Sequence, residues 1–249
     1  FFFDETFFSR PFVQQLEPHG YQLVIFDFSV RLSSPVFPLT KRVFRVPAAN
    51  KTEIEHSLSF NHETMGFFRF YPTINGNFSA RFTLLPYDAG NRYLDYVARP
   101  LADTLQAKPI ILIFEYPHKA QDNGLAFFRY LMTKQDTFDT YYVIEKNAPD
   151  VANLTPSLDR VIFYKSAEHI RLFFAASYLI SSHTPNYGIP LLTKKTEKKR
   201  SHMHKIFLQH GITALKNVEP FYGNRSNPGL IDTVIVSSQR EKTLIESEM

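Results

Sequence analysis

The chain of 249 residues contains no cysteine and no tryptophan. Without cysteine it can form no disulfide, no thiolate metal site and no cysteine nucleophile, which is compatible with the cytoplasm. No apolar run approaches the roughly 18–20 residues that a membrane helix needs. The first residues, Phe1 to Phe3 followed by Asp4 and Glu5, lack the basic start of a signal peptide. Because an initiator methionine is also lacking, we expect the chain to be a piece of a longer protein.

What the chain does contain is typical of a folded protein with a substantial core. Hydrophobic residues make up 44% and charged residues 21% of the sequence, values that exclude disordered and fibrous classes. The aromatic share is dominated by 25 phenylalanines, which cluster in the first third of the chain and are interpreted as core. The length allows one large domain or two ordinary ones.

A basic cluster stands out against a formal net charge of only +4. Its members are Lys194, Lys195, Lys198, Lys199, Arg200 and Lys205. Such a cluster is either an exposed loop or a contact surface for an anionic membrane or a polyanionic substrate. His202 and His204 lie between these residues, but no third ligand is nearby, so we expect no metal site.

The region from Tyr21 to about Tyr87 alternates apolar and polar residues with period two. Phe78, Ala80, Phe82 and Leu84, for example, alternate with polar or charged residues. Turn residues separate several such runs, a pattern typical of an antiparallel β-sandwich or barrel. We therefore predict a β-sandwich domain over residues 1–95, and we see no catalytic constellation in it.

The pattern changes after a helix-like stretch at residues 91–105. The continuous apolar run from Pro109 to Phe114 predicts a strand buried on both faces, and residues 124–134 show helical spacing. Further predicted strands and helices alternate along the chain: strands at 141–144, 160–164, 179–180, 205–208 and 234–236, and helices at 166–178 and 238–249. This alternation predicts a Rossmann-like α/β domain with a parallel sheet over residues 96–249.

In an open parallel sheet, ligands bind beyond the carboxyl ends of the strands. The most informative of these loops follows the predicted strand at 205–208 and begins Gln209-His210-Gly211. An imidazole at a sheet edge can take a proton from a hydroxyl group, or it can merely hold the loop through hydrogen bonds. Gly211 would permit close approach of a ligand, and Lys216 could neutralise a phosphate as a point charge.

Other polar residues near these loops have ordinary structural explanations. Asp122 and Asn123 precede a predicted helix, so helix N-capping is their default role. Ser238 followed by Glu241 is a predicted capping box. His183 faces the predicted cleft, and its role stays open.

The segment from His210 to Lys216 resembles the His-Gly-x-x-x-x-Lys signature of the CDP-glycerol glycerophosphotransferase family. Further segments resemble this family in the same order along the chain: the loop at 115–123, the strand at 139–146, the strand–helix–strand at 160–182 and the strand at 231–238. The resemblance covers roughly residues 109–249. His118 stands where the family usually has glycine, and Gln209 stands where tryptophan is common before the His-Gly pair.

This resemblance implies the first half of a GT-B fold, in which two Rossmann-like domains flank a cleft. It implies transfer of a polyol phosphate from CDP-glycerol or CDP-ribitol, with no other cofactor, onto a lipid-linked polymer. His210 would be the general base, Gly211 would make room for the acceptor, and Lys216 would offset phosphate charge. Asp122, Asn123 and His183 are further candidate substrate-binding residues.

The nucleotide-binding half of this family lies downstream, so we expect this piece by itself to be inactive. The implied setting is the cytoplasmic face of the cell membrane, with Lys194, Lys195, Lys198, Lys199 and Arg200 contacting the anionic surface and no nucleic-acid partner. Two alternatives stay open: a sugar-nucleotide glycosyltransferase or epimerase, and a non-catalytic module that binds polymer or membrane.

Overall fold

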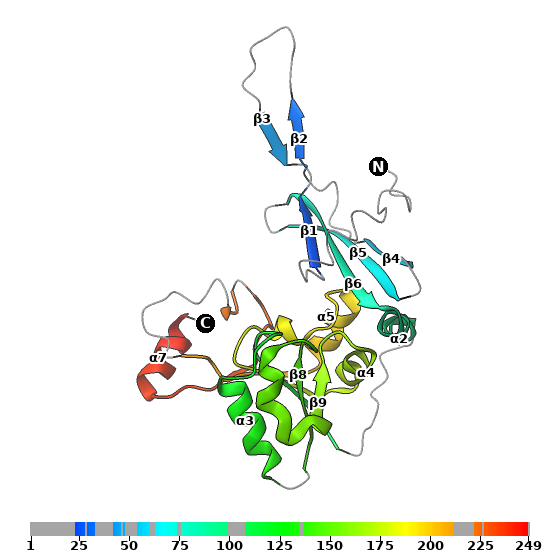
Figure 1. Ribbon diagram of the computed structural model, residues 1–249. Coiled ribbons are helices and arrows are strands. Elements are labelled where there is room, and N and C mark those ends of the chain that lie inside the picture. The colour runs from blue at the N-terminus through cyan, green and yellow to red at the C-terminus, as the bar shows by residue number, and fades with distance from the viewer. Residues whose placement is uncertain are drawn as a thin grey trace. The chain divides into compact units, whose positions relative to one another are not determined.

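The structure is a computed structural model that describes residues 23–27, 29–32, 42–45, 47, 54–59, 63–73, 76–98, 108–134, 137–211, 222–225 and 227–248 (Figure 1). The chain divides into two compact units, Phe1–Gly90 and Asn91–Met249. The division falls within helix α2 (Tyr87–Ala98), the same helix that contains the sequence-based boundary between residues 95 and 96. No helix in these described ranges is long and apolar enough to cross a membrane.

The first unit contains antiparallel strands, as the period-two alternation predicts. Four of them form a sheet in the order β1-β6-β5-β4, with bounds Leu23–Asp27, Phe78–Pro86, Thr64–Pro72 and Ile54–Ser59. Strands β2 (Ser29–Leu32) and β3 (Arg42–Arg45) pair separately. The arrangement of two packed sheets that defines a sandwich stays a prediction.

Phenylalanine side chains make up much of the core of this first unit, as interpreted from the sequence. Phe67, Phe68 and Phe82 are buried, and the rings of Phe68 and Phe82 stack with centroids 4.4 Å apart. The β5–β6 hairpin turns through Gly76, whose positive φ of 74° is a conformation that glycine adopts without steric cost.

The second unit is a Rossmann-like α/β domain, as predicted. Its six strands are all parallel and lie in the order β12-β11-β10-β7-β8-β9. Their bounds are Ile110–Phe114 for β7, Asp139–Ile144 for β8, Val161–Phe163 for β9, Tyr178–Ser181 for β10, His204–Phe207 for β11 and Thr233–Val234 for β12. The order reverses between β7 and β10, so the carboxyl ends of these two strands flank the position where open α/β sheets bind ligands.

Helical segments connect these strands, and α7 follows the last of them. They are α3 (Asn123–Met132), η2 (Pro149–Arg160), α4 (Ala167–Ala175), η3 (Pro185–Gly188), α5 (Lys194–Ser201) and α7 (Gln239–Glu248). The interpretation of the basic cluster as a loop is wrong, because most of it forms helix α5. Thr193 and Thr196 make a capping box at its start, and the Tyr93 hydroxyl donates a 2.7 Å hydrogen bond to Thr193 Oγ1.

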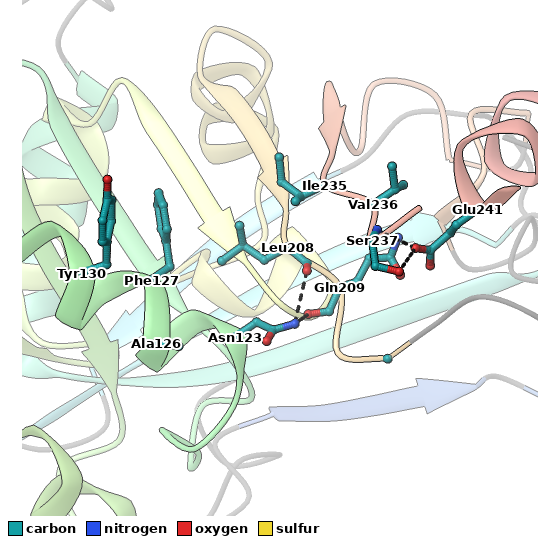
Figure 2. Close-up of a pocket in the computed structure, with 11 residues that line it drawn as sticks. Asn123, Ala126, Phe127, Tyr130, Leu208, Gln209, Ile235, Val236, Ser237 and Glu241 are labelled. Carbon is teal, nitrogen blue, oxygen red and sulfur yellow. Dashed lines mark hydrogen bonds between the residues drawn. The ribbon is translucent and has the colours of Figure 1, made fainter. Parts of the chain in front are cut away.

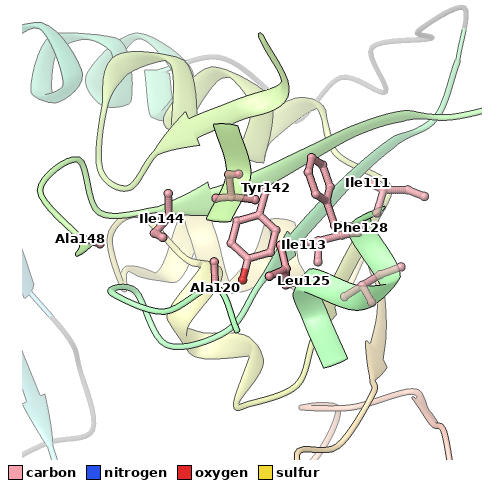
Figure 3. Packing of buried hydrophobic residues seen from close by; sticks show 10 residues of the cluster. Ile111, Ile113, Ala120, Leu125, Phe128, Tyr142, Ile144 and Ala148 are labelled. Carbon is pink, nitrogen blue, oxygen red and sulfur yellow. The ribbon is translucent and has the colours of Figure 1, made fainter. Parts of the chain in front are cut away.

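The core of the second unit lies on both faces of β7, whose five residues are all buried. Figure 3 shows Ile111 and Ile113 packed with Leu125 and Phe128 of α3 and with the Tyr142 ring. On the opposite face the ring of Phe114 contacts the backbone of η3 at Gly188. Burial on both faces explains why the sequence of β7 is a continuous apolar run.

Candidate active site

Three neighbouring strands end at the same level of the sheet. In the strand register Ser181 of β10 lies opposite Phe114 of β7 and Phe207 of β11, so the loops that follow them emerge side by side. These loops enclose a pocket of about 320 Å³. Its lining residues are Glu115, Tyr116, His118, Lys119, Gln121, Asp122, His183 and His210. The pocket therefore lies at the reversal of strand order, where the fold predicts a ligand.

The first loop is held by a buried carboxylate, Glu115, whose side chain is fully buried. It accepts hydrogen bonds of 2.9 Å from the backbone N–H groups of Gln121, Asp122 and Leu125. These amides lie just before α3 and in its first turn, and the amino-terminal end of a helix favours a negative charge. A Cβ on Gly124 would lie 2.8 Å from Glu115 Cγ, so glycine permits this close packing. The fold thus supplies its own anion at the start of α3.

Asp122 and Asn123 have different roles in the structure. Asp122 is the N-cap of α3, which confirms its default role, and it also lines the pocket. The Asn123 amide instead donates hydrogen bonds of 3.0 Å to the Gln209 carbonyl and 3.4 Å to the Leu208 carbonyl. Asn123 therefore ties the start of α3 to the loop that carries His210, and Figure 2 shows this connection.

His210 is exposed and lines the pocket, as the general-base hypothesis requires. Its Nδ1 lies 2.8 Å from the backbone carbonyl oxygen of Ser182. A carbonyl only accepts, so Nδ1 carries the proton and donates. In the neutral ring the lone pair is then on Nε2, which is the form that can take a proton from a hydroxyl. The preceding residue, Gln209, has a φ of 60°, which is the left-handed backbone conformation that non-glycine residues adopt rarely.

His183 is buried behind His210, with the two rings nearly parallel at an interplanar angle of 8° and a centroid distance of 4.5 Å. The ring of Tyr116 also contacts His183, at a centroid distance of 3.9 Å. Burial and the neighbouring His210 lower the pKa of His183 from 6.5 to about 4. His183 is therefore neutral at physiological pH.

The sequence analysis missed most of the pocket's other residues. Tyr116, His118, Lys119 and Gln121 come from the same loop as Glu115, and no role was predicted for these side chains. Tyr187 of η3 adds a further ring 5.2 Å from Tyr116, and burial is the main cause of its raised pKa. The signal that could have found them is the dense run of polar and aromatic residues directly after a buried strand.

Gly211 lines a second pocket, of about 530 Å³, that Figure 2 shows between α3 and the segment joining β12 to α7. Its other lining residues are Asn123, Ala126, Phe127, Tyr130, Leu208, Gln209, Ile235, Val236, Ser237 and Glu241. Gly211 thus adjoins a different pocket from His210. Lys216, the predicted phosphate contact, lies outside the described residues.

The basic residues of α5 differ in their exposure to solvent. Lys194, Lys195 and Lys198 are exposed, whereas Lys199 and Arg200 are half-buried. The Arg200 guanidinium donates a 2.7 Å hydrogen bond to Asn186 Oδ1, and burial lowers its pKa. Lys205 is buried, with its Nζ 2.8 Å from Asp232 Oδ2, so it does not belong to the exposed cluster.

The remaining histidines and acids of the predicted sites make local contacts. The His202 ring nitrogen Nδ1 lies 2.7 Å from the Lys198 carbonyl, and His204 Nε2 lies 2.9 Å from Thr233 Oγ1. No group of three potential metal ligands occurs within the part of the chain that the structure describes. Ser238 Oγ accepts from the Glu241 N–H at 3.2 Å, and the Glu241 carboxylate accepts from the N–H of Ser237 at 2.8 Å. The predicted capping box is therefore present in shifted form.

Comparison with known proteins identifies a family for this chain. The family model described as CDP-glycerol:poly(glycerophosphate) glycerophosphotransferase matches residues 96–230, more than half of the chain. The minor teichoic acid biosynthesis protein GgaB of Bacillus subtilis (strain 168) is 31% identical over 114 residues, which are 45% of this chain and 13% of that protein. No solved structure matches the chain. The chain belongs to the CDP-glycerol:poly(glycerophosphate) glycerophosphotransferase family.

Proposed function

We propose that this chain is the acceptor-side part of a transferase that moves glycerol phosphate, or another polyol phosphate, from a CDP-polyol to the end of a lipid-linked polymer. The product would be a teichoic-acid-like polymer of the cell wall or capsule. The family match and the similarity to a teichoic acid biosynthesis protein support this class of reaction. The observation that carries the proposal is His210, an exposed imidazole whose Nδ1 is engaged by the Ser182 carbonyl beside a pocket.

In this reaction the terminal hydroxyl oxygen of the acceptor attacks the β-phosphorus of the CDP-polyol. A new oxygen–phosphorus bond forms as the bond between this phosphorus and the CMP oxygen breaks, and CMP leaves with the bonding electrons. The hydroxyl proton passes to Nε2 of His210. Such a transfer asks the protein mainly for positioning and for neutralisation of charge. Lys119, which lines the same pocket, is a further cation within this arrangement.

The choice of donor tests the proposed class of reaction. Full-length protein with a lipid-linked acceptor should release CMP from CDP-glycerol or CDP-ribitol and extend the polymer, as followed by chromatography of nucleotides and of polymer length. Sugar nucleotides, supplied at the same concentration, should not be consumed. Consumption of a sugar nucleotide with no release of CMP would show that the chain is part of a glycosyltransferase instead.

We also propose that α5 binds the anionic cytoplasmic face of the membrane. Changing Lys194, Lys195 and Lys198 to Glu should weaken binding to vesicles containing phosphatidylserine by about 100-fold, since each basic residue near such a surface contributes roughly 1 kcal/mol. Sedimentation with vesicles measures this binding. Changing the exposed Lys134, Lys146 and Lys242 to Glu alters the net charge equally and should weaken binding less. Equal loss in both triple variants would mean that net charge, not α5, governs the binding.

A further inference from the structure

His183 lies between two other rings in the pocket wall. Its ring contacts that of Tyr116 at a centroid distance of 3.9 Å and stacks on that of His210 at 4.5 Å. Unlike His210, it is almost fully buried, with 7% of its surface exposed. A buried ring fixed in this way is poorly placed to exchange protons with a substrate, but it can hold a more exposed ring in place.

One residue, Ser182, orients both imidazoles. Its backbone carbonyl accepts from His210 Nδ1 at 2.8 Å, and its hydroxyl lies 3.1 Å from His183 Nδ1. The backbone of His183 is fixed as well, because the Ser181 hydroxyl donates a 2.6 Å hydrogen bond to its carbonyl oxygen. Ser181 and Ser182 are both fully buried at the end of β10. The sheet therefore sets the relative orientation of the two rings.

We propose that His183 is a positioning residue for His210, and that the stacked pair accepts a single proton, which is held on His210 while His183 stays neutral. This inference rests on the proposed role of His210 as general base. Two imidazolium rings stacked at 4.5 Å would repel each other, whereas a neutral ring offers its aromatic face to a cation. His183 thus supports both the placement and the charged form of His210.

The groups around His183 agree with this assignment. The titratable and charged residues that line the same pocket are Glu115, Tyr116, His118, Lys119, Asp122 and His210. Tyr187 of η3 adjoins Tyr116. Burial and His210 depress the pKa of His183 to about 4, and Asp122 opposes this effect only in part. Glu115, the other acid that lines this pocket, already accepts three backbone hydrogen bonds at the start of α3.

Proton uptake by the pair can be measured without any assay of activity. With the histidine rings labelled with ¹³C and ¹⁵N, NMR should show the neutral ring of His210 as the Nδ1–H tautomer, and the two rings should not both be charged at physiological pH. His183 should become charged only near pH 4. Variants His183→Phe and His210→Gln assign the two signals. Protonation of both rings above about pH 5 would overturn the proposal.

Kinetics of the full-length enzyme then test positioning. His183→Ala removes the stacked ring and should lower kcat by about 10- to 100-fold with KM within about threefold, because misplacing a reacting group mainly affects the transition state. His183→Phe keeps an aromatic ring without a titratable group and should restore kcat to within about fivefold of wild type. If His183→Phe is as slow as His183→Ala although folded by circular dichroism, stacking is not the role of His183. Failure of the base assignment is seen separately, as an unchanged rate for a His210 variant.

Discussion

Replacing His210 by glutamine is expected to lower kcat of the full-length transferase by about 10²- to 10⁴-fold, the usual contribution of a general base. Glutamine can still donate a hydrogen bond to the Ser182 carbonyl, which His210 Nδ1 contacts at 2.8 Å, but it cannot accept a proton. The loss should therefore fall on kcat, and KM for the donor should change little. Release of CMP from a CDP-polyol, followed over time, measures the effect.

His204→Gln is the matched control for this variant. His204 is an exposed histidine at the amino end of β11, whereas His210 follows the carboxyl end of this strand. His204 contacts Thr233. A surface substitution of this kind should leave the rate within about twofold of wild type. A full rate for His210→Gln would exclude His210 as the base and favour the reading of the chain as a module that binds polymer or membrane.

Replacing Glu115 by alanine is expected to destabilise the second unit by about 3–5 kcal/mol. The buried carboxylate accepts from three backbone N–H groups, each at 2.9 Å. A hydrogen bond to a charged group contributes about 1.5–3 kcal/mol, and the amides would lose their partner without regaining bulk water. Chemical unfolding followed by far-UV circular dichroism measures the change, because the chain has no tryptophan to report by fluorescence.

Two further variants separate this effect from a general loss of negative charge. Glu115→Gln keeps one oxygen, which can replace Oε1 as the acceptor for Asp122 and Leu125, so its destabilisation should be smaller than that of Glu115→Ala. Glu168 is half-exposed and pairs with Arg171, and Glu168→Ala should cost less than about 1 kcal/mol. Equal destabilisation by Glu115→Ala and Glu168→Ala would show that the hydrogen bonds of Glu115 contribute little.

The sequence predicts the second unit well where burial leaves a periodic pattern. The run at β7 is apolar because both of its faces are covered, and the helix after it has its apolar residues on the side that meets the sheet. The position of His210 follows from the same argument, since a residue just after a predicted parallel strand must lie at the carboxyl edge of the sheet. Periodicity was sufficient for these features.

Helix α5 and the contacts between loops that are distant in the sequence were not predicted. Helix α5 carries no apolar stripe, because its residues from Lys194 to Ser201 are all polar, and the local signal for it is the Thr193–Thr196 capping box. Asn123 contacts carbonyl groups more than 80 residues away in the sequence. The pairing of His183 with His210 also requires two loops to meet in space. A single sequence contains no pattern that indicates contacts between loops so far apart along the chain.

The strand order also constrains when this pocket can form as the chain folds. Strand β10 lies between β7 and β11, although β8 and β9 precede it in the chain. The β7–β8–β9 part of the sheet can assemble from segments that are close in sequence. Strand β10 must instead pair with the other edge of β7, and pairing between strands distant in sequence is slow. Because Ser182 follows β10, both imidazoles acquire their orientation only after β10 has paired with β7. A ribosome-bound nascent chain would therefore complete this pocket late, after most of the sheet has already formed.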